Sequence, residues 1–222
     1  MRQEQGRQQR LRITFAKGEE LKFISHLDVM RLWERALRRA SIPLLYSKGY
    51  NPRPKISIAA PLAVGFTGKR ELMDLLLERT IAPLDFAASV RKQLPTGMTL
   101  AEVEEVYPAL PSLQSQVRSA EYRIIVETQE TPAEIQGRLG GLLRSEHLPR
   151  QRRGKEYDLR PLIEDLWLAE KTEEGCVLRM RLRAGEQGTG RPDEVLAELR
   201  LKDSVRAVQR TQLYFTSPKD TA

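Results

Sequence analysis

Four arginines in the segment HLDVMRLWERALRRA (26–40) are spaced so that they could bind phosphate: Arg31, Arg35, Arg38 and Arg39. The first three follow one another at i, i+4 and i+7, so a helix would place them on one side. Like charges at this spacing repel unless an anion lies between them, and a guanidinium binds phosphate through two hydrogen bonds. The alternative is a solvated face on which Glu34 pairs with one arginine.

The loop YSKGYNPRPK (46–55) interleaves basic and aromatic residues: Tyr46, Lys48, Tyr50, Arg53 and Lys55. Such a mixture suits single-stranded nucleic acid, because cations follow the phosphates while aromatic rings stack on bases. The alternative is a rigid connection whose tyrosines pack on the domain. The following segment, PLAVGFTGKR (61–70), lacks the spacing of a phosphate-binding P-loop and is interpreted as a hairpin-type connection.

Residues that could catalyse a reaction are few. His26 at the start of the arginine helix could act as a general base in RNA cleavage, but no partner for it is identifiable. The single cysteine, Cys176, cannot form an internal disulfide or hold a cluster alone. His147 has no metal-ligand spacing to either residue. These patterns favour a binding protein over an enzyme, without a metal or cofactor.

Charge is distributed unevenly along the 222 residues. Residues 1–70 hold 15 Lys and Arg against 5 Asp and Glu, or +10, and the remainder holds 22 against 25, or −3, which together give the net charge of +7. A one-sided positive field attracts phosphate backbones or anionic membranes. No apolar run approaches the roughly 20 residues that span a bilayer, and the start, MRQEQGRQQR, lacks a signal-peptide core. We expect a cytoplasmic protein.

Hydrophobic periodicity in the first half predicts the order β-α-β-β-α-β. The expected strands are 10–16, 54–60, 72–78 and 98–106, and the expected helices are 26–40 and 85–94. Ser25 is a good N-cap for the first helix, and Trp33 belongs to its apolar stripe. This order is ferredoxin-like.

After a Pro-containing linker, 107–118, the order is expected to repeat. Strands are predicted at 121–128, within 150–159, at 165–171 or 176–183, and at 208–215, with helices at 132–144 and 192–201. The predicted fold is α+β with two tandem ferredoxin-like halves. The predicted division is a disordered tail (1–9), a basic first half (10–106), the linker, a second half (119–216) and a second tail (217–222).

Residues 22–68, KFISHLDVMRLWERALRRASIPLLYSKGYNPRPKISIAAPLAVGFTG, resemble the signature of the radical-SAM-linked protein family, a bacterial domain of unknown function. The runs FISHLD, RALRRA and GYNPRP together carry the resemblance. Members are found fused to, or encoded beside, cobalamin-binding radical SAM proteins. The resemblance implies an accessory role in RNA or ribosome-related processing or modification. The chain has no Cys-x-x-x-Cys-x-x-Cys run, so it is not itself the radical SAM enzyme.

Three functions remain open. The first is an RNA-binding accessory protein that uses the arginine helix and the tyrosine-containing loop. The second is a metal-independent RNA-cleaving or RNA-modifying enzyme with His26 as base. The third is a protein-interaction module that docks on a radical SAM partner. RNA is the expected ligand in the first two, and no membrane association is expected.

Overall fold

The computed structural model describes residues 8–216 except residues 153, 186 and 187. Most of the predicted N-terminal tail, and all of the predicted C-terminal tail at 217–222, lie outside the described residues. The chain divides into two compact units, Met1–Gln116 and Val117–Ala222, and each is described by itself. No helix among the described residues combines the length and apolarity needed to cross a bilayer.

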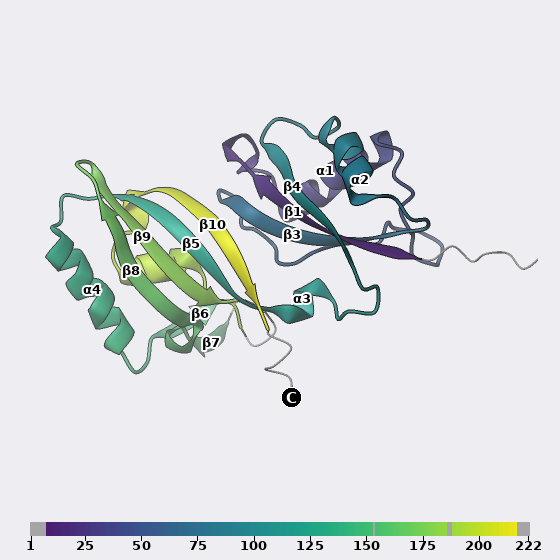
Figure 1. Ribbon diagram of the computed structural model, residues 1–222. Coiled ribbons are helices and arrows are strands. Elements are labelled where there is room, and N and C mark those ends of the chain that lie inside the picture. Colours follow the sequence, from purple (N-terminus) through teal and green to yellow (C-terminus); the bar gives the residue numbers. More distant parts are fainter. Residues whose placement is uncertain (1–7, 153, 186–187, 217–222) are drawn as a thin grey trace, which may run out of the picture. The chain divides into compact units, whose positions relative to one another are not determined.

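The first unit is an antiparallel sheet with helices α1 and α2 on one side (Figure 1). Its strands lie in the order β4-β1-β3, and β2 pairs with β3. The elements are β1 (Gln9–Lys17), the 3-10 helix η1 (Glu19–Leu21), α1 (His26–Arg39), β2 (Ile56–Ile58), β3 (Thr67–Leu77), α2 (Pro83–Arg91), β4 (Met98–Val106) and α3 (Leu113–Gln116).

The core of the first unit lies between the two helices and one face of the sheet. Trp33 of α1 is fully buried and meets Phe15 of β1 edge-to-face, with ring centroids 5.2 Å apart. This confirms that Trp33 belongs to the core stripe. Because side chains alternate along a strand, Arg10 and Arg12 of β1 point to the opposite face of the sheet from Phe15.

The second unit is also antiparallel, with the strand order β10-β5-β9-β8. Helix α4 lies against β8 and begins with a reciprocal capping box between Thr131 and Glu134. The elements are β5 (Val117–Glu127), α4 (Pro132–Arg144), β6 (Pro149–Arg152), β7 (Lys155–Asp158), the 3-10 helix η2 (Arg160–Leu162), β8 (Ile163–Lys171), β9 (Gly175–Arg183), α5 (Pro192–Glu198), the 3-10 helix η3 (Lys202–Ser204) and β10 (Val205–Phe215).

The prediction of two tandem ferredoxin-like halves is wrong, although the fold is α+β. In the second unit, four strands rather than two lie between α4 and α5, because both 165–171 and 176–183 belong to strands and β6 and β7 form an additional two-stranded sheet. Those two strands are short and polar, so they carry little hydrophobic periodicity.

Candidate nucleic-acid interface

Helix α1 presents an apolar side to the core and a basic side to solvent. Val29, Trp33, Ala36 and Leu37 are buried. The predicted cap is confirmed: the Ser25 hydroxyl oxygen accepts a hydrogen bond from the backbone N–H of Asp28. All four predicted arginines of α1 are exposed, so the helix directs them into solvent.

Two of the four arginines already have polar partners. Arg31 forms an ion pair with Asp28 at 3.1 Å, and the Arg39 guanidinium donates to the backbone carbonyl of Gln93. The Ser25 hydroxyl, and then Arg31, hold the pKa of Asp28 below its ordinary value. The acid that pairs with an arginine is therefore Asp28, and among the described residues Glu34 takes part in no ion pair.

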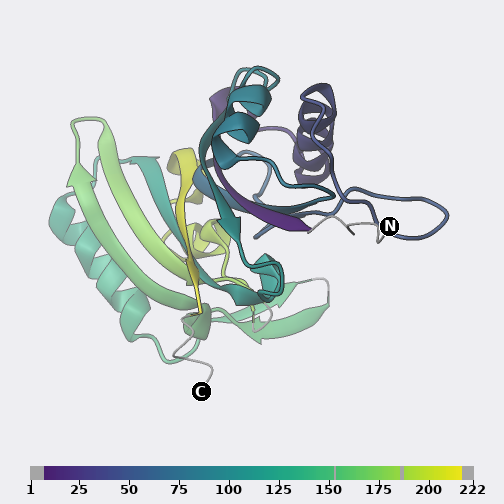
Figure 2. The same cartoon turned by 45° about the vertical axis from the view of Figure 1, so that its right-hand side comes forward.

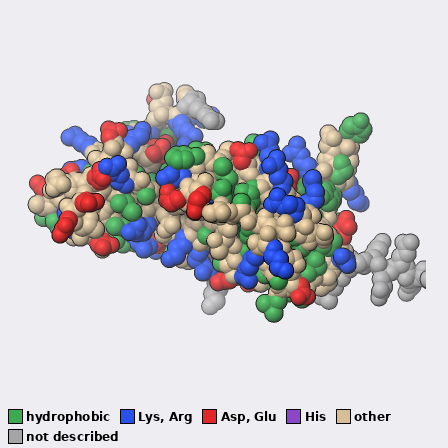
Figure 3. Space-filling view, turned by 90° about the horizontal axis from the view of Figure 1, so that it is seen from above, with side chains coloured by type: hydrophobic (Ala, Val, Ile, Leu, Met, Phe, Trp, Pro, Cys, Tyr) green, Lys and Arg blue, Asp and Glu red, His purple; other side chains and the backbone are tan. Residues whose placement is uncertain are grey.

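Arg35 and Arg38 are the free cations of this helix. Within the described part of the chain neither is in an ion pair. Figure 3 shows Lys and Arg side chains spread over the surface, with several close together on the first unit, at the right. We use "arginine pair" for Arg35 and Arg38, the two exposed arginines of α1 without an ion pair among the described residues.

The loop at residues 46–55, here called the basic loop, is a short antiparallel arm that projects from the first unit (Figure 2). The Ser47 N–H donates to the carbonyl of Arg53 at 2.8 Å, and the Arg53 N–H donates to the Ser47 hydroxyl. Nearer the root of the loop, the Lys55 N–H donates to the carbonyl of Leu45. The arms are therefore held together, while the tip extends beyond them.

The tip of the basic loop exposes both predicted tyrosines. Tyr50 is completely exposed, at 101% of its reference area, and Tyr46 is 41% exposed. Gly49 adopts a φ of +133°, which disfavours a side chain at that position. The alternative that the tyrosines pack on the domain does not hold for Tyr50.

The three cations of the basic loop are also exposed: Lys48, Arg53 and Lys55. None of their side chains is in an ion pair with any residue that the structure describes. The basic loop thus combines free positive charge with an exposed aromatic ring, as a single-strand binding surface requires.

The backbone joins α1 to the basic loop through a short, ordered connection. Ser41 adopts a left-handed φ of 55° after the helix, and the Ile42 N–H donates to the carbonyl of Leu37. The Leu45 N–H then donates to the carbonyl of Leu76 on β3. The root of the loop is therefore fixed to both the helix end and the sheet.

His26 is the first residue of α1 and lines a small hollow with two buried ionisable side chains, Lys17 of β1 and Glu71 of β3. Both are 2% exposed, and the Lys17 ammonium donates to the carbonyls of Lys22 and Ile24. The hollow has a volume of about 10 Å³, which is the space of about one water molecule. A hollow of this size does not hold a nucleotide, and the role of His26 as a base stays a prediction.

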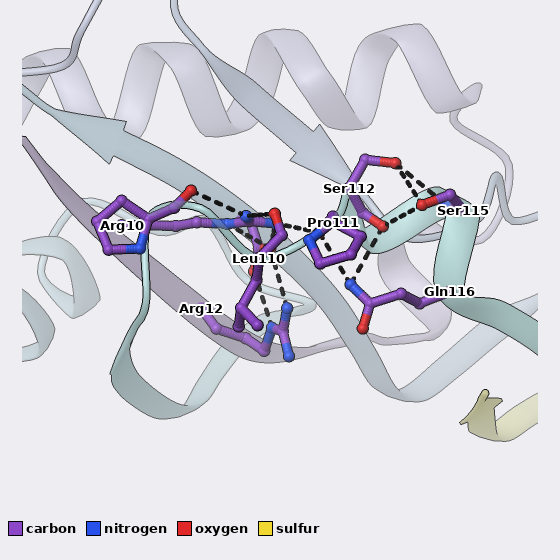
Figure 4. A network of polar contacts seen from close by, with 9 residues as sticks. Arg10, Arg12, Leu110, Pro111, Ser112, Ser115 and Gln116 are labelled. Atoms are coloured by element: carbon purple, nitrogen blue, oxygen red, sulfur yellow. Dashed lines mark hydrogen bonds and ion pairs between the residues drawn. The ribbon is translucent and has the colours of Figure 1, made fainter. Parts of the chain in front are cut away.

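A buried ion network that the sequence pattern did not indicate lies on the other face of the first sheet (Figure 4). Asp74 of β3 accepts hydrogen bonds from Arg10 at 2.6 Å and from Arg12 at 2.9 Å. Arg10 also donates to the backbone carbonyls of Leu110 and Pro111. The alternating arginines of RLRITFA were the available signal, because they had to face away from the core.

A metal site is not apparent within the described ranges, where no three His, Cys, Asp or Glu side chains converge. Cys176 is buried, and burial raises the pKa of its thiol. Neither observation supplies a reactive centre.

The chain belongs to a bacterial family. The model of the family described as "Uncharacterized protein conserved in bacteria (DUF2344)" matches residues 10–192. No curated protein matches the sequence. The link to radical SAM proteins stays a prediction from the resemblance.

Three of the solved structures that match this chain do so at low sequence identity. A chain of a Cbf5-Nop10-Gar1 complex matches 90% of this chain with 9% identity and a TM-score of 0.49. A chain of an H/ACA RNP bound to a substrate RNA, and one of an archaeal box H/ACA Nop10-Cbf5 complex, each match with 10% identity and a TM-score of 0.48. The match spans about half the length of those chains, 47–48%.

Proposed function

We propose that this protein binds single-stranded RNA through the arginine pair and the basic loop. The observation that carries the proposal is the basic loop itself, in which a fully exposed Tyr50 stands among three free cations. An exposed aromatic ring is unfavourable in water, and a base stacked on it removes that cost. The cations neutralise phosphates on either side of such a base.

The arginine pair extends this surface along α1. The two residues lie one turn apart on the helix, and each has a guanidinium that can bind a phosphate through two hydrogen bonds. Because their mutual repulsion is relieved only by an anion, a phosphate backbone is the ligand that best fits them.

The proposal is tested by titrating the protein into a fluorescently labelled single-stranded RNA and following anisotropy. Tyr50→Ala should weaken binding by roughly tenfold, since a stacked base contributes ~1–3 kcal/mol. Replacing Arg35→Ala together with Arg38→Ala should weaken binding by roughly the same factor, since the contacts of two cations with phosphate are lost. The matched control is Lys155→Ala with Lys202→Ala, which removes the same charge from exposed positions of the second unit. Equal losses of RNA affinity in the two double variants would contradict the proposal, because only the net charge of the protein would then matter.

We infer in addition that the protein acts as an accessory in RNA or ribosome processing or modification, beside a radical SAM partner. This part rests on the resemblance of residues 22–68. Affinity capture from the native host, with and without ribonuclease treatment, tests it. A radical SAM protein retained after ribonuclease indicates direct docking, and one lost after ribonuclease indicates a shared RNA. Recovery of RNA with no such protein in either arm would remove the partner from the proposal.

A further inference from the structure

A groove of about 410 Å³ runs along the face of the first sheet that carries the buried ion network. Lys55 and Ser57 form one wall, Pro108 and Leu110 form the other, and Leu76 lies between them. The volume is within the range of sites that enclose small organic groups, about 300–1,000 Å³. The groove adjoins the basic loop, because Lys55 belongs to both.

The Arg10 network ties one wall of the groove to the sheet. Arg10 is 7% exposed and donates to the carbonyls of Leu110 at 2.6 Å and Pro111 at 3.0 Å, while Asp74 holds the guanidinium from β3 (Figure 4). The wall at 108–111 is thus fixed to the sheet by a charged group rather than by apolar packing alone. A preformed groove loses little conformational freedom when it takes a ligand.

The chemistry of the groove suits a flat group that is apolar on its faces and polar at its edge. Leu76, Pro108 and Leu110 offer apolar surface to such faces. Ser57 lies opposite Asp74 in the register of β2 and β3, and within the described residues its hydroxyl has no partner. The Lys55 ammonium lies at the junction with the basic loop, and it too has no partner within the described residues.

Resting on the proposed function, we propose that this groove takes one unpaired base of the RNA strand that crosses the basic loop. The base lies between Leu76 and the wall at 108–111, Ser57 bonds to its edge, and Lys55 neutralises the adjoining phosphate. The substrate class is therefore single-stranded RNA with at least one base turned away from its neighbours. Duplex RNA does not fit, since its bases are stacked and paired.

The test combines RNAs that each lack one base with protein variants altered in the groove. A set of labelled single-stranded RNAs, each with one abasic residue at a different position, is titrated against the whole protein. We expect two sensitive positions, one for Tyr50 and one for the groove, each weakening binding by roughly tenfold. Ser57→Phe, which fills the groove, should abolish sensitivity at one position only, and Tyr50→Ala should abolish it at the other.

Leu110→Ala provides a second route, because Leu110 is 39% exposed and its loss does not disturb the core. It should weaken binding to intact RNA and leave binding to the matching abasic RNA unchanged. RNA binding that keeps both sensitive positions in both groove variants would overturn the groove assignment and leave the proposed function standing. Binding of a free nucleoside monophosphate as tight as that of the oligonucleotide would also overturn it. Absence of RNA binding by the unaltered protein would overturn both.

Discussion

At the scale of single residues, the buried charges of the first unit show which polar groups the fold depends on. Asp74 is 4% exposed and bridges two arginines of β1. The hydrogen bond that Arg12 donates to the Asp74 carboxylate raises the pKa of Arg12. A carboxylate enclosed by two guanidinium groups cannot be removed without leaving positive charge in a dry environment.

Replacing Asp74→Ala should therefore lower the free energy of unfolding by ~3–5 kcal/mol, the cost of breaking a buried ion pair from one side. Urea denaturation measures the change. Asp28→Ala is the matched control, since it breaks the exposed pair with Arg31 and should lower stability much less. Similar losses for the two variants would show that the Asp74 network is not structurally important.

Asp158 should make stability depend on acid pH. The N–H of Leu148, then His147, and then the N–H of Arg160 hydrogen bond to this carboxylate and lower its pKa from 3.8 to about 2. A lowered pKa in the folded state gives stability that is present above the ordinary value and lost as pH falls toward about 2. Thermal melting between pH 2 and 5 should show a steeper decline for the native protein than for Asp158→Asn.

At the scale of elements, helix α1 is the part of the fold that the sequence specified most fully. The Ser25 cap, the apolar stripe and the basic side all agree, so its first residue was predicted correctly and its last within one position. Ser25→Ala should lower the free energy of unfolding by about 1 kcal/mol, because the N–H of Asp28 then loses its acceptor. Thr131→Ala, which removes the cap of α4, gives the comparison, and unchanged stability in both would contradict the role of these caps.

Strand β3 shows why other elements were harder to predict. Its first residues, within GFTGKRE, resemble a turn because they contain two glycines and several charges. They pair with β1 nevertheless, with an irregular register between Phe15 and Lys17. A Cβ at Gly68 would lie 2.6 Å from the Glu71 side chain, so this glycine makes room for a buried carboxylate. Such a requirement arises from tertiary contact and leaves no periodic signal.

The candidate site likewise has one part that the sequence predicts and one part that it does not. The arginine helix and the basic loop could be identified from residue types and spacing alone. The groove could not, because its lining comes from segments about 50 residues apart in the sequence that the fold brings together. Sequence periodicity reports which face of an element is apolar, and it does not report which loops will cover the other face.

At the scale of the whole molecule, the uneven charge distribution predicts how RNA binding responds to salt. If the arginine pair and the three cations of the basic loop each contact one phosphate, the logarithm of the association constant should fall against the logarithm of salt with a slope of about −3.5. Arg35→Ala with Arg38→Ala should reduce the slope to about −2. Titrations between 50 and 200 mM salt measure both slopes. An unchanged slope would show that the arginine pair makes no phosphate contact.

The projecting tip of the basic loop also makes the chain vulnerable at one point. The Lys48–Gly49 peptide bond lies at an exposed tip, where proteases cut folded chains most readily, whereas the bond after Arg53 is protected by Pro54. Trypsin should therefore nick the native protein first at Lys48. The two fragments should stay together, because the hydrogen bonds between Ser47 and Arg53 and between Leu45 and Lys55 lie below the cut. A ligand lying over the tip should slow this cleavage, which gives a footprint of the loop without any label.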